Sequence, residues 1–148
     1  MAIRQAATKD VPAIQACAAE AYEKYVERIG KKPAPMVADF AQQVRQKTVH
    51  VSVGPQGEIE GFIVFYPRAD HMHLENVAVG PRHQRKGVGK RLIEFCENAA
   101  RQAGLRAIEL YANETMTENL RLYPRLGYEE TGRREEGGFN RVFFRKVI

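Results

Sequence analysis

The fold is decided by one stretch of sequence, residues 73–103, which reads HLENVAVGPRHQRKGVGKRLIEFCENAARQA. Its first part, Leu74–Val79, is mostly apolar and stops at Gly80-Pro81, which predicts a strand. From Val88 onward, apolar residues recur at the spacing of one helix face as far as Ala103. The stretch is therefore predicted to run from a strand, through a short glycine-containing loop, into an amphipathic helix.

The loop, residues 82–89, has the features of an anion site. It lies at the N-terminus of the predicted helix, where backbone N–H groups lack intrahelical acceptors and the helix dipole is positive. Gly87 and Gly89 carry no side chain that would keep an anion away from these N–H groups. Positive charge is added by five basic side chains, Arg82, Arg85, Lys86, Lys90 and Arg91. We therefore expect the loop to bind a phosphate group.

Two common phosphate loops do not fit this segment. A P-loop needs Ser or Thr after its Gly-Lys pair, whereas Gly89-Lys90 is followed by Arg91. A dinucleotide-binding loop needs a third glycine three residues after the second, and that position is Leu92. The remaining hexapeptide, QRKGVG at residues 84–89, follows the strand end at residues 77–79. In this setting it resembles the pyrophosphate loop of the GNAT family of N-acetyltransferases.

A second segment carries the same resemblance. The family pattern of an Asn, a Tyr four residues later and then Gly-Tyr is matched by Asn119, Tyr123 and Gly127-Tyr128. The resemblance implies transfer of an acetyl group from acetyl-CoA to an amine. It implies that the cofactor is held by the backbone of Val77, Ala78 and Val79, by Gln84, Arg85, Lys86, Gly87, Val88, Gly89 and Lys90, and by Asn119.

Two residues are predicted to do the chemistry. By resemblance, the Tyr123 hydroxyl lies near the sulfur and acts as the acid, which suits a phenol because its reference pKa is about 1–2 units above that of a thiol. Pro124 departs from the pattern, since a proline removes a backbone bond and is expected to bend the helix and re-aim Tyr123. Glu75 is the predicted base, directly or through water, because an acidic residue in an apolar strand is costly unless it is paired or functional.

Histidines near Glu75 leave an alternative open. Strand alternation is expected to place His71, His73 and Glu75 on one face together with Val77. His73 titrates near neutral pH, so it is a second candidate for the base and a predicted substrate contact. Three such groups could also hold a metal, but the family needs none and no metal is expected.

The remaining segments predict an α+β fold with a mixed central β-sheet flanked by helices on both faces, in one domain spanning residues 1–148. Predicted strands are Ile3–Ala7, Thr48–Val53, Ile59–Tyr66, His71–Val79, Ala107–Tyr111, one from Gly127 onward, and Arg141–Ile148. Predicted helices are Val11 to about Gly30, a short one within Met36–Val44, Val88–Ala103 and Met116–Leu126. This element order is also that of the GNAT family.

Composition narrows the classes of protein. The 148 residues are 44% apolar and 28% charged, as in a globular domain, and the start of the chain lacks a signal-peptide core, so a cytoplasmic location without membrane insertion is expected. Cys17 and Cys96 fall on apolar helix stripes and are expected to be reduced core thiols. The net charge of +5 is spread along the chain and no aromatic residues alternate with the basic loop, so nucleic-acid binding is not expected.

The acceptor amine stays open at this stage. In the family, the site for the acceptor is shaped by the first two helices and their connecting loop. Tyr25, from this region, is a predicted substrate contact. The sequence does not choose between a small amine, an amino acid, an antibiotic and a protein amine, nor does it decide whether the chain is a homodimer. A non-catalytic acyl-CoA-binding module and a nucleic-acid- or protein-binding domain are the competing readings.

Overall fold

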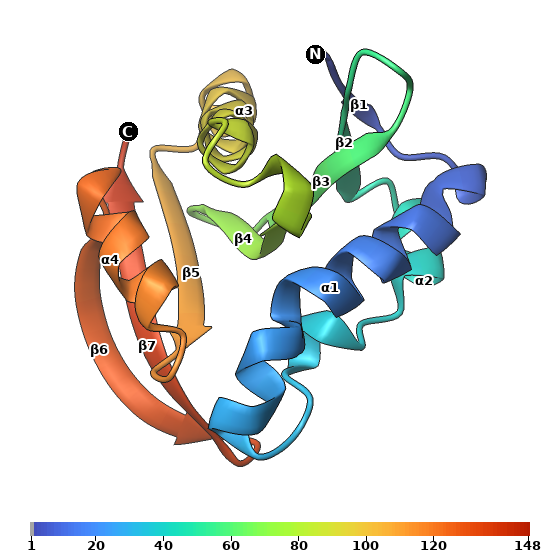
Figure 1. Cartoon of the computed structure of the whole chain (residues 1–148). Helices are drawn as coiled ribbons and strands as arrows, with labels where there is room; N and C mark the ends of the chain where they lie inside the picture. Colours follow the sequence, from blue (N-terminus) through green and yellow to red (C-terminus); the bar gives the residue numbers. More distant parts are fainter. Residues whose placement is uncertain (1) are drawn as a thin grey trace.

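The computed structural model describes residues 2–148, which form one seven-stranded sheet with helices on both faces (Figure 1). The predicted α+β class and the predicted order of elements are confirmed. The strands are β1 (Ala2–Gln5), β2 (Val49–Val53), β3 (Ile59–Pro67), β4 (Met72–Val79), β5 (Ala107–Asn113), β6 (Glu129–Glu136) and β7 (Phe139–Val147). The α-helices are α1 (Val11–Ile29), α2 (Phe40–Arg45), α3 (Val88–Gln102) and α4 (Thr117–Arg125), with 3-10 turns at Thr8–Asp10, Ala34–Met36 and Pro81–His83.

The sheet has the strand order β1-β2-β3-β4-β5-β7-β6. Neighbouring strands are antiparallel except β4 and β5, which run parallel. These two strands pair only through Met72 with Ile108 and His73 with Glu109. Beyond His73 they diverge, so along residues 74–79 the edge of β4 that faces β5 has no strand partner among the described residues. The sheet is therefore split at its centre.

Each face of the sheet has its own apolar core. On one face α1 and α2 pack over β2 and β3, with Ile14, Phe40 and Phe62 almost fully buried. On the other face α3 and α4 pack over β3, β4, β5 and β7, and Leu92 and Ile108 are fully buried. Because the apolar stripe of α3 repeats every three or four residues, it forms one continuous buried face.

The structure adjusts several predicted boundaries. The helix predicted within Met36–Val44 begins only at Phe40, because the Asp39 side chain accepts a hydrogen bond from the Gln42 N–H (3.1 Å) and caps it there. The preceding residues form the separate 3-10 turn. β6 begins at Glu129 because Gly127, in a left-handed conformation (φ 94°), belongs to the turn that ends α4.

Two further expectations concern the whole chain. Cys17 and Cys96 are both free and buried, as predicted. Within residues 2–148, no helix combines the length and the apolar character that crossing a bilayer demands.

Candidate functional site

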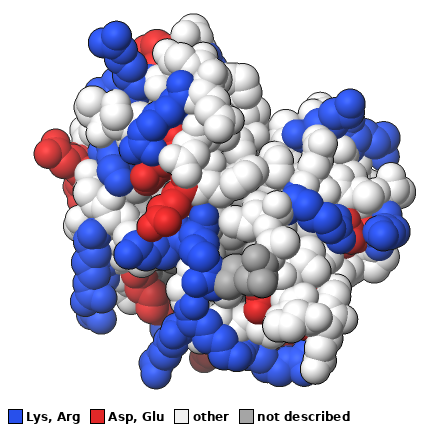
Figure 2. Space-filling view, turned by 90° about the horizontal axis from the view of Figure 1, so that it is seen from above, with Lys and Arg blue, Asp and Glu red and all other residues white. Residues whose placement is uncertain are grey.

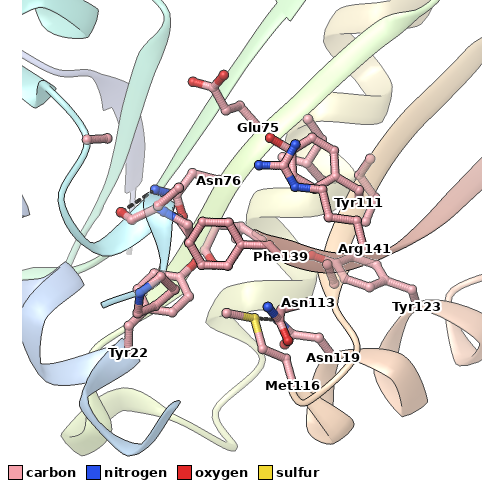
Figure 3. A pocket seen from close by; sticks show the side chains of 18 of the residues that line it. Tyr22, Glu75, Asn76, Tyr111, Asn113, Met116, Asn119, Tyr123, Phe139 and Arg141 are labelled. Atoms are coloured by element: carbon pink, nitrogen blue, oxygen red, sulfur yellow. Dashed lines mark hydrogen bonds between the residues drawn. The ribbon is translucent and has the colours of Figure 1, made fainter. Parts of the chain in front are cut away.

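A pocket of about 340 Å³ lies where β4 and β5 diverge (Figure 3). Its walls come from α1, the segment between α1 and α2, α2, β4, β5 with the turn after it, α4 and the start of β7. The lining side chains used below are Tyr22, Gln43, Glu75, Asn76, Tyr111, Met116, Asn119, Tyr123, Phe139 and Arg141. Glu75, Asn119 and Tyr123, three residues singled out by the sequence, thus border one cavity.

A β-bulge in β4 sets the direction of Glu75. Across from β3, Asn76 pairs with Val64 and Leu74 pairs with Phe65, so Glu75 is the extra residue. The bulge interrupts the alternation of side chains. Glu75 points toward α2, whereas Val77 packs into the core on the α3 face. The expectation that Glu75 and Val77 share a face was wrong, because it assumed a strand without a bulge.

Glu75 is held by two neutral donors. The Gln43 Nε2 donates to one carboxylate oxygen (2.8 Å) and the Tyr66 hydroxyl donates to the other (3.2 Å). Burial and the nearby Glu75 charge raise the pKa of Tyr66, so its proton stays on the phenol. No cation among residues 2–148 forms an ion pair with Glu75. The carboxylate is thus oriented by hydrogen bonds from two neutral groups.

Unlike Glu75, neither His71 nor His73 lines the pocket. His73 packs against Tyr66 (ring centroids 5.3 Å) and Tyr111 (6.1 Å) and does not line the pocket. Burial, helped by nearby positive charge, lowers the pKa of His73 to about 4, so the ring is neutral and weakly basic near pH 7. His71 precedes β4 and its Nδ1 lies 2.7 Å from Asp70. No cluster of three metal-ligating side chains occurs within the described residues.

Tyr123 lies on α4 with its side chain against the pocket. It is 4% exposed, and its ring packs against Tyr128 and Phe144, each at 5.6 Å between centroids. No described residue hydrogen-bonds to its hydroxyl. Burial raises the pKa of Tyr123 above its ordinary value, so the phenol keeps a proton to donate near neutral pH. Pro124 is the last residue but one of α4, so the lost backbone bond falls at the end of the helix.

Asn119 lies one helical turn before Tyr123 and lines the same pocket. Its side-chain amide contacts the sulfur of Met116 at 3.7 Å. The two residues that the resemblance paired therefore do face one cavity. Tyr25, by contrast, does not line the pocket: it is buried, and its hydroxyl donates to Glu118 at 3.1 Å.

Glu118 connects α1 to α4, one residue before Asn119, which lines the pocket. Besides Tyr25, its carboxylate binds Lys24 (2.9 Å) and Arg28 (2.8 Å), all from α1. The Arg28 hydrogen bond is the largest reason why the pKa of Glu118 lies well below its usual range. This ion cluster holds the start of α4 against α1, on the helix that carries Asn119.

Two buried residues, Tyr22 and Asn76, hold the opposite wall, and of these the sequence did not single out Asn76. The Tyr22 hydroxyl donates to Asn76 Oδ1 (2.6 Å) and lies 3.2 Å from the Val77 carbonyl oxygen. The Asn76 amide donates to the carbonyl of Pro35 (3.0 Å). This network fastens α1 and the segment after it to β4 beside the bulge. Asparagine in an apolar strand was the one available signal, since a buried amide needs partners.

The basic loop enters α3 directly. Gly87, with φ 82°, is the N-cap residue, a left-handed conformation that glycine adopts without strain. The N–H groups of residues 84–90 meet no acceptor within residues 2–148. The Gln84 amide donates to the Val79 carbonyl (3.2 Å) and joins the loop to the end of β4. Arg85, Lys86 and Lys90 are exposed beside these N–H groups, so the predicted loop geometry for an anion is present.

On the face seen from above (Figure 2), the charges do not form a single basic surface. Seen from above, Lys and Arg side chains occur in several groups, with Asp and Glu among them and uncharged surface between (Figure 2). Many of the basic residues are paired, for example Arg133 with Glu130 (3.0 Å) and Arg145 with Glu109 (3.2 Å).

Comparison with known proteins gives a consistent result. A family model described as "Acetyltransferase (GNAT) family" matches residues 14–128. The chain is 32% identical over 91 residues to probable N-acetyltransferase 14 of Xenopus tropicalis, covering 60% of this chain and 44% of that protein. It is 25% identical over 91 residues to the [ribosomal protein bS18]-alanine N-acetyltransferase of Escherichia coli strain K12, covering 62% of each. The matches thus span about half of these relatives' lengths.

Solved structures share the fold over nearly the whole chain. PaiA N-acetyltransferase from Thermoplasma acidophilum, in complex with coenzyme A, superposes with a TM-score of 0.81 at 14% identity, covering 99% of this chain and 98% of that one. Naa20 from Chaetomium thermophilum, in complex with a bisubstrate analogue, gives 0.76 at 18% identity, covering 100% and 87%. At these identities the likeness is one of fold.

Proposed function

Because the chain belongs to the acetyltransferase (GNAT) family, we propose that it is an N-acetyltransferase that moves an acetyl group from acetyl-CoA to a primary amine. One observation carries the proposal. Glu75 and Tyr123, a proton acceptor and a proton donor, line the same pocket at the point where β4 separates from β5. The relatives named above are N-acetyltransferases, which agrees with it.

The residues present fit the cofactor. The N–H groups of residues 84–90 meet no acceptor within the described chain, which suits a pyrophosphate at a helix N-terminus. The exposed side chains of Arg85, Lys86 and Lys90 would add charge. The edge of β4 at Val77–Val79 that is not paired with β5 suits hydrogen bonding to the amides of pantetheine. Asn119 lines the same pocket as Val77. When bound, acetyl-CoA supplies the acetyl group as a reactive thioester.

The proposed chemistry uses the two pocket residues in turn. Glu75, oriented by Gln43 and Tyr66, accepts the proton that the ammonium must lose before its nitrogen attacks, directly or through one water. The new C–N bond forms as the C–S bond breaks. Tyr123 then gives its proton to the leaving thiolate and regains one from the second N–H that the attacking nitrogen must lose, and its raised pKa keeps the proton available for the thiolate. His73 is the weaker candidate for the base, since it stays outside the pocket with a pKa of about 4.

Calorimetric titration with acetyl-CoA tests the cofactor, with ATP as a control ligand. We expect micromolar binding selective for acetyl-CoA. Gly87→Val puts a side chain at the left-handed N-cap of α3 and is expected to weaken binding by at least about tenfold. Gly104→Val is the matched control, because Gly104 has a similar φ (77°) at the opposite end of α3. Equal affinity for both variants would contradict the loop assignment.

A thiol-release assay with a panel of primary amines tests turnover. We expect release of free CoA that depends on the amine and falls strongly in Glu75→Gln. Binding of acetyl-CoA without turnover on any amine would instead indicate a non-catalytic acyl-CoA-binding module.

A further inference from the structure

The pocket contains one charge that the proposed chemistry does not use. Of the described residues that line it, Glu75 and Arg141 are the two with acidic or basic side chains, and the rest have apolar, aromatic, hydroxyl or amide side chains. They come from β4 and β7 respectively (Figure 3). Glu75 matches the ammonium of an acceptor. The guanidinium of Arg141 would match an anionic group on the same acceptor molecule.

Arg141 is held in place before any ligand arrives. Its guanidinium lies over the Tyr111 ring at 4.3 Å from the centroid, and its Nη1 donates to Glu136 (2.9 Å). The side chain is 19% exposed. Its Nε and Nη2 donate to no described residue, so a fork of N–H groups is left for a ligand. A planar guanidinium fixed by stacking suits a carboxylate, which it can bind through two parallel hydrogen bonds.

The local charge balance favours an anion as well. Glu136 is shared between Arg141 and Arg134, whose Nε lies 3.0 Å from it. Lys31 brings a further cation to this end of the pocket, with its Nζ 4.2 Å from the ring centroid of Phe139. Two arginines thus share one carboxylate, and Lys31 adds a cation beside Phe139. The internal pairing leaves positive charge for a bound anion.

The space available indicates a small acceptor. The Lys31–Phe139 contact joins the segment after α1 to the start of β7, so chain borders the pocket at this end. The cavity of about 340 Å³ must also take the acetyl end of the cofactor. Pockets for drug-sized ligands have volumes of about 300–1,000 Å³. The volume that is left for the acceptor once the acetyl end is bound is therefore smaller than a drug-sized ligand needs.

We propose that the acceptor is a small zwitterion of the amino-acid class, with its ammonium toward Glu75 and its free carboxylate on Arg141. This inference rests on the proposed acetyltransferase function and narrows it. A protein N-terminus would present a neutral amide where the carboxylate is expected. A polyamine would present a second cation to Arg141, which costs free energy through like-charge repulsion.

The test compares free amino acids with their C-terminal amides in the thiol-release assay. We expect kcat/KM to favour the free acid by at least about tenfold for the best amino acid, mostly through KM. Arg141→Gln is expected to remove this preference by lowering kcat/KM for the free acid. Arg145→Gln is the matched control: Arg145 is also on β7 and pairs with a carboxylate, Glu109, but lies outside the pocket.

The outcomes separate this inference from the function it rests on. Acetylation of amides or peptides as fast as free acids would overturn it, and so would a preference that survives Arg141→Gln. In both cases acetyl-CoA binding and turnover would leave the proposed function standing. A folded protein that does not bind acetyl-CoA would overturn both. Unchanged acetyl-CoA affinity in Arg141→Gln, measured by calorimetry, shows that this variant is folded.

Discussion

Replacing Tyr123 by Phe removes one hydroxyl and leaves the ring in place. The ring is 4% exposed and packs against Tyr128 and Phe144, so Phe fills the same space. Alanine would instead leave a large cavity at a cost of about 3–5 kcal/mol. The lost hydroxyl has no hydrogen-bond partner among the described residues, so no buried group is left unsatisfied. We expect the free energy of unfolding to change by less than about 1 kcal/mol.

The effect on kcat is expected to be much larger than the effect on stability. A positioned general acid contributes about 10²–10⁴-fold, and a water molecule can replace part of that. We expect kcat to fall by about 100-fold, which corresponds to about 2.7 kcal/mol in the activation barrier. The affinity for acetyl-CoA should change little, because the pocket keeps its shape. Since burial raises the pKa of Tyr123, the wild-type acid stays protonated through neutral and mildly alkaline pH.

The measurement combines thiol release at saturating substrate, calorimetric acetyl-CoA affinity and denaturant unfolding. Tyr128→Phe is the matched control. The Tyr128 hydroxyl donates to buried Glu97 (2.8 Å), which also binds Lys146, and it lies outside the pocket. That variant should lose about 1–3 kcal/mol of stability while kcat stays within about twofold of wild type. If Tyr123→Phe kept the wild-type kcat while chemistry limited the rate, Tyr123 would not be the acid.

Three further predictions address the base, the contact between α1 and α4, and the response to acid. Glu75→Gln keeps the side-chain volume and is expected to lower kcat by about 100-fold near neutral pH. Gln43→Ala leaves the carboxylate with one hydrogen bond, from the Tyr66 hydroxyl, and should lower kcat by less. A larger loss of kcat in Gln43→Ala than in Glu75→Gln, measured by thiol release, would contradict the role of Glu75 as the base. A double-mutant cycle of Glu118→Gln with Arg28→Ala should give a coupling free energy below about 1 kcal/mol in urea unfolding, because the two side chains are 42% and 43% exposed. If no coupling were measured even at low salt, this ion pair would not help to hold α4 against α1. Burial lowers the pKa of His73 in the folded protein to about 4, against an ordinary value of 6.5, so the unfolded chain takes up a proton first as the pH falls. The free energy of unfolding should therefore decrease between pH 6.5 and 4, by up to about 3 kcal/mol from this group, and His73→Gln should flatten that part of the stability profile.

Much of the fold could be predicted because each segment carries a local signal. The apolar stripe of α3 and the turn residues between strands are properties of neighbouring positions, and the structure confirms the elements they predict. The anion loop is equally local, since its glycines, basic residues and helix N-terminus lie within one short stretch. The side chains around Glu75 follow a different logic. Gln43 and Arg141 reach the pocket only through long-range packing, and no periodicity in their own segments indicates it.

Arg141 shows how register supplies what local pattern cannot. It pairs with Asn113 at the end of β5, in an antiparallel ladder that begins at Ala107 and Val147. The ladder fixes which residue of β7 lies beside the end of β5, which is also a wall of the pocket. A shift by one residue would turn the side chain to the other face of the sheet. The charge that defines the proposed acceptor thus depends on a pairing between segments about 30 residues apart.

The bulge in β4 shows why even a local reading of the central strand was incomplete. Alternation predicts Glu75 and Val77 on one face, which would place the carboxylate with the apolar residues that pack on α3. The extra residue at Glu75 reverses that relation, so the carboxylate faces Gln43 and Tyr66 while Val77 stays in the core. The bulge lies just beyond His73, the last residue of β4 that pairs with β5. One irregularity beside this split therefore turns Glu75, the proposed base, toward Gln43 and Tyr66, and close to it lies the strand edge that we propose for the cofactor. Without the bulge, regular alternation along β4 would place Glu75 on the same face as Val77, so the carboxylate would no longer face Gln43 and Tyr66.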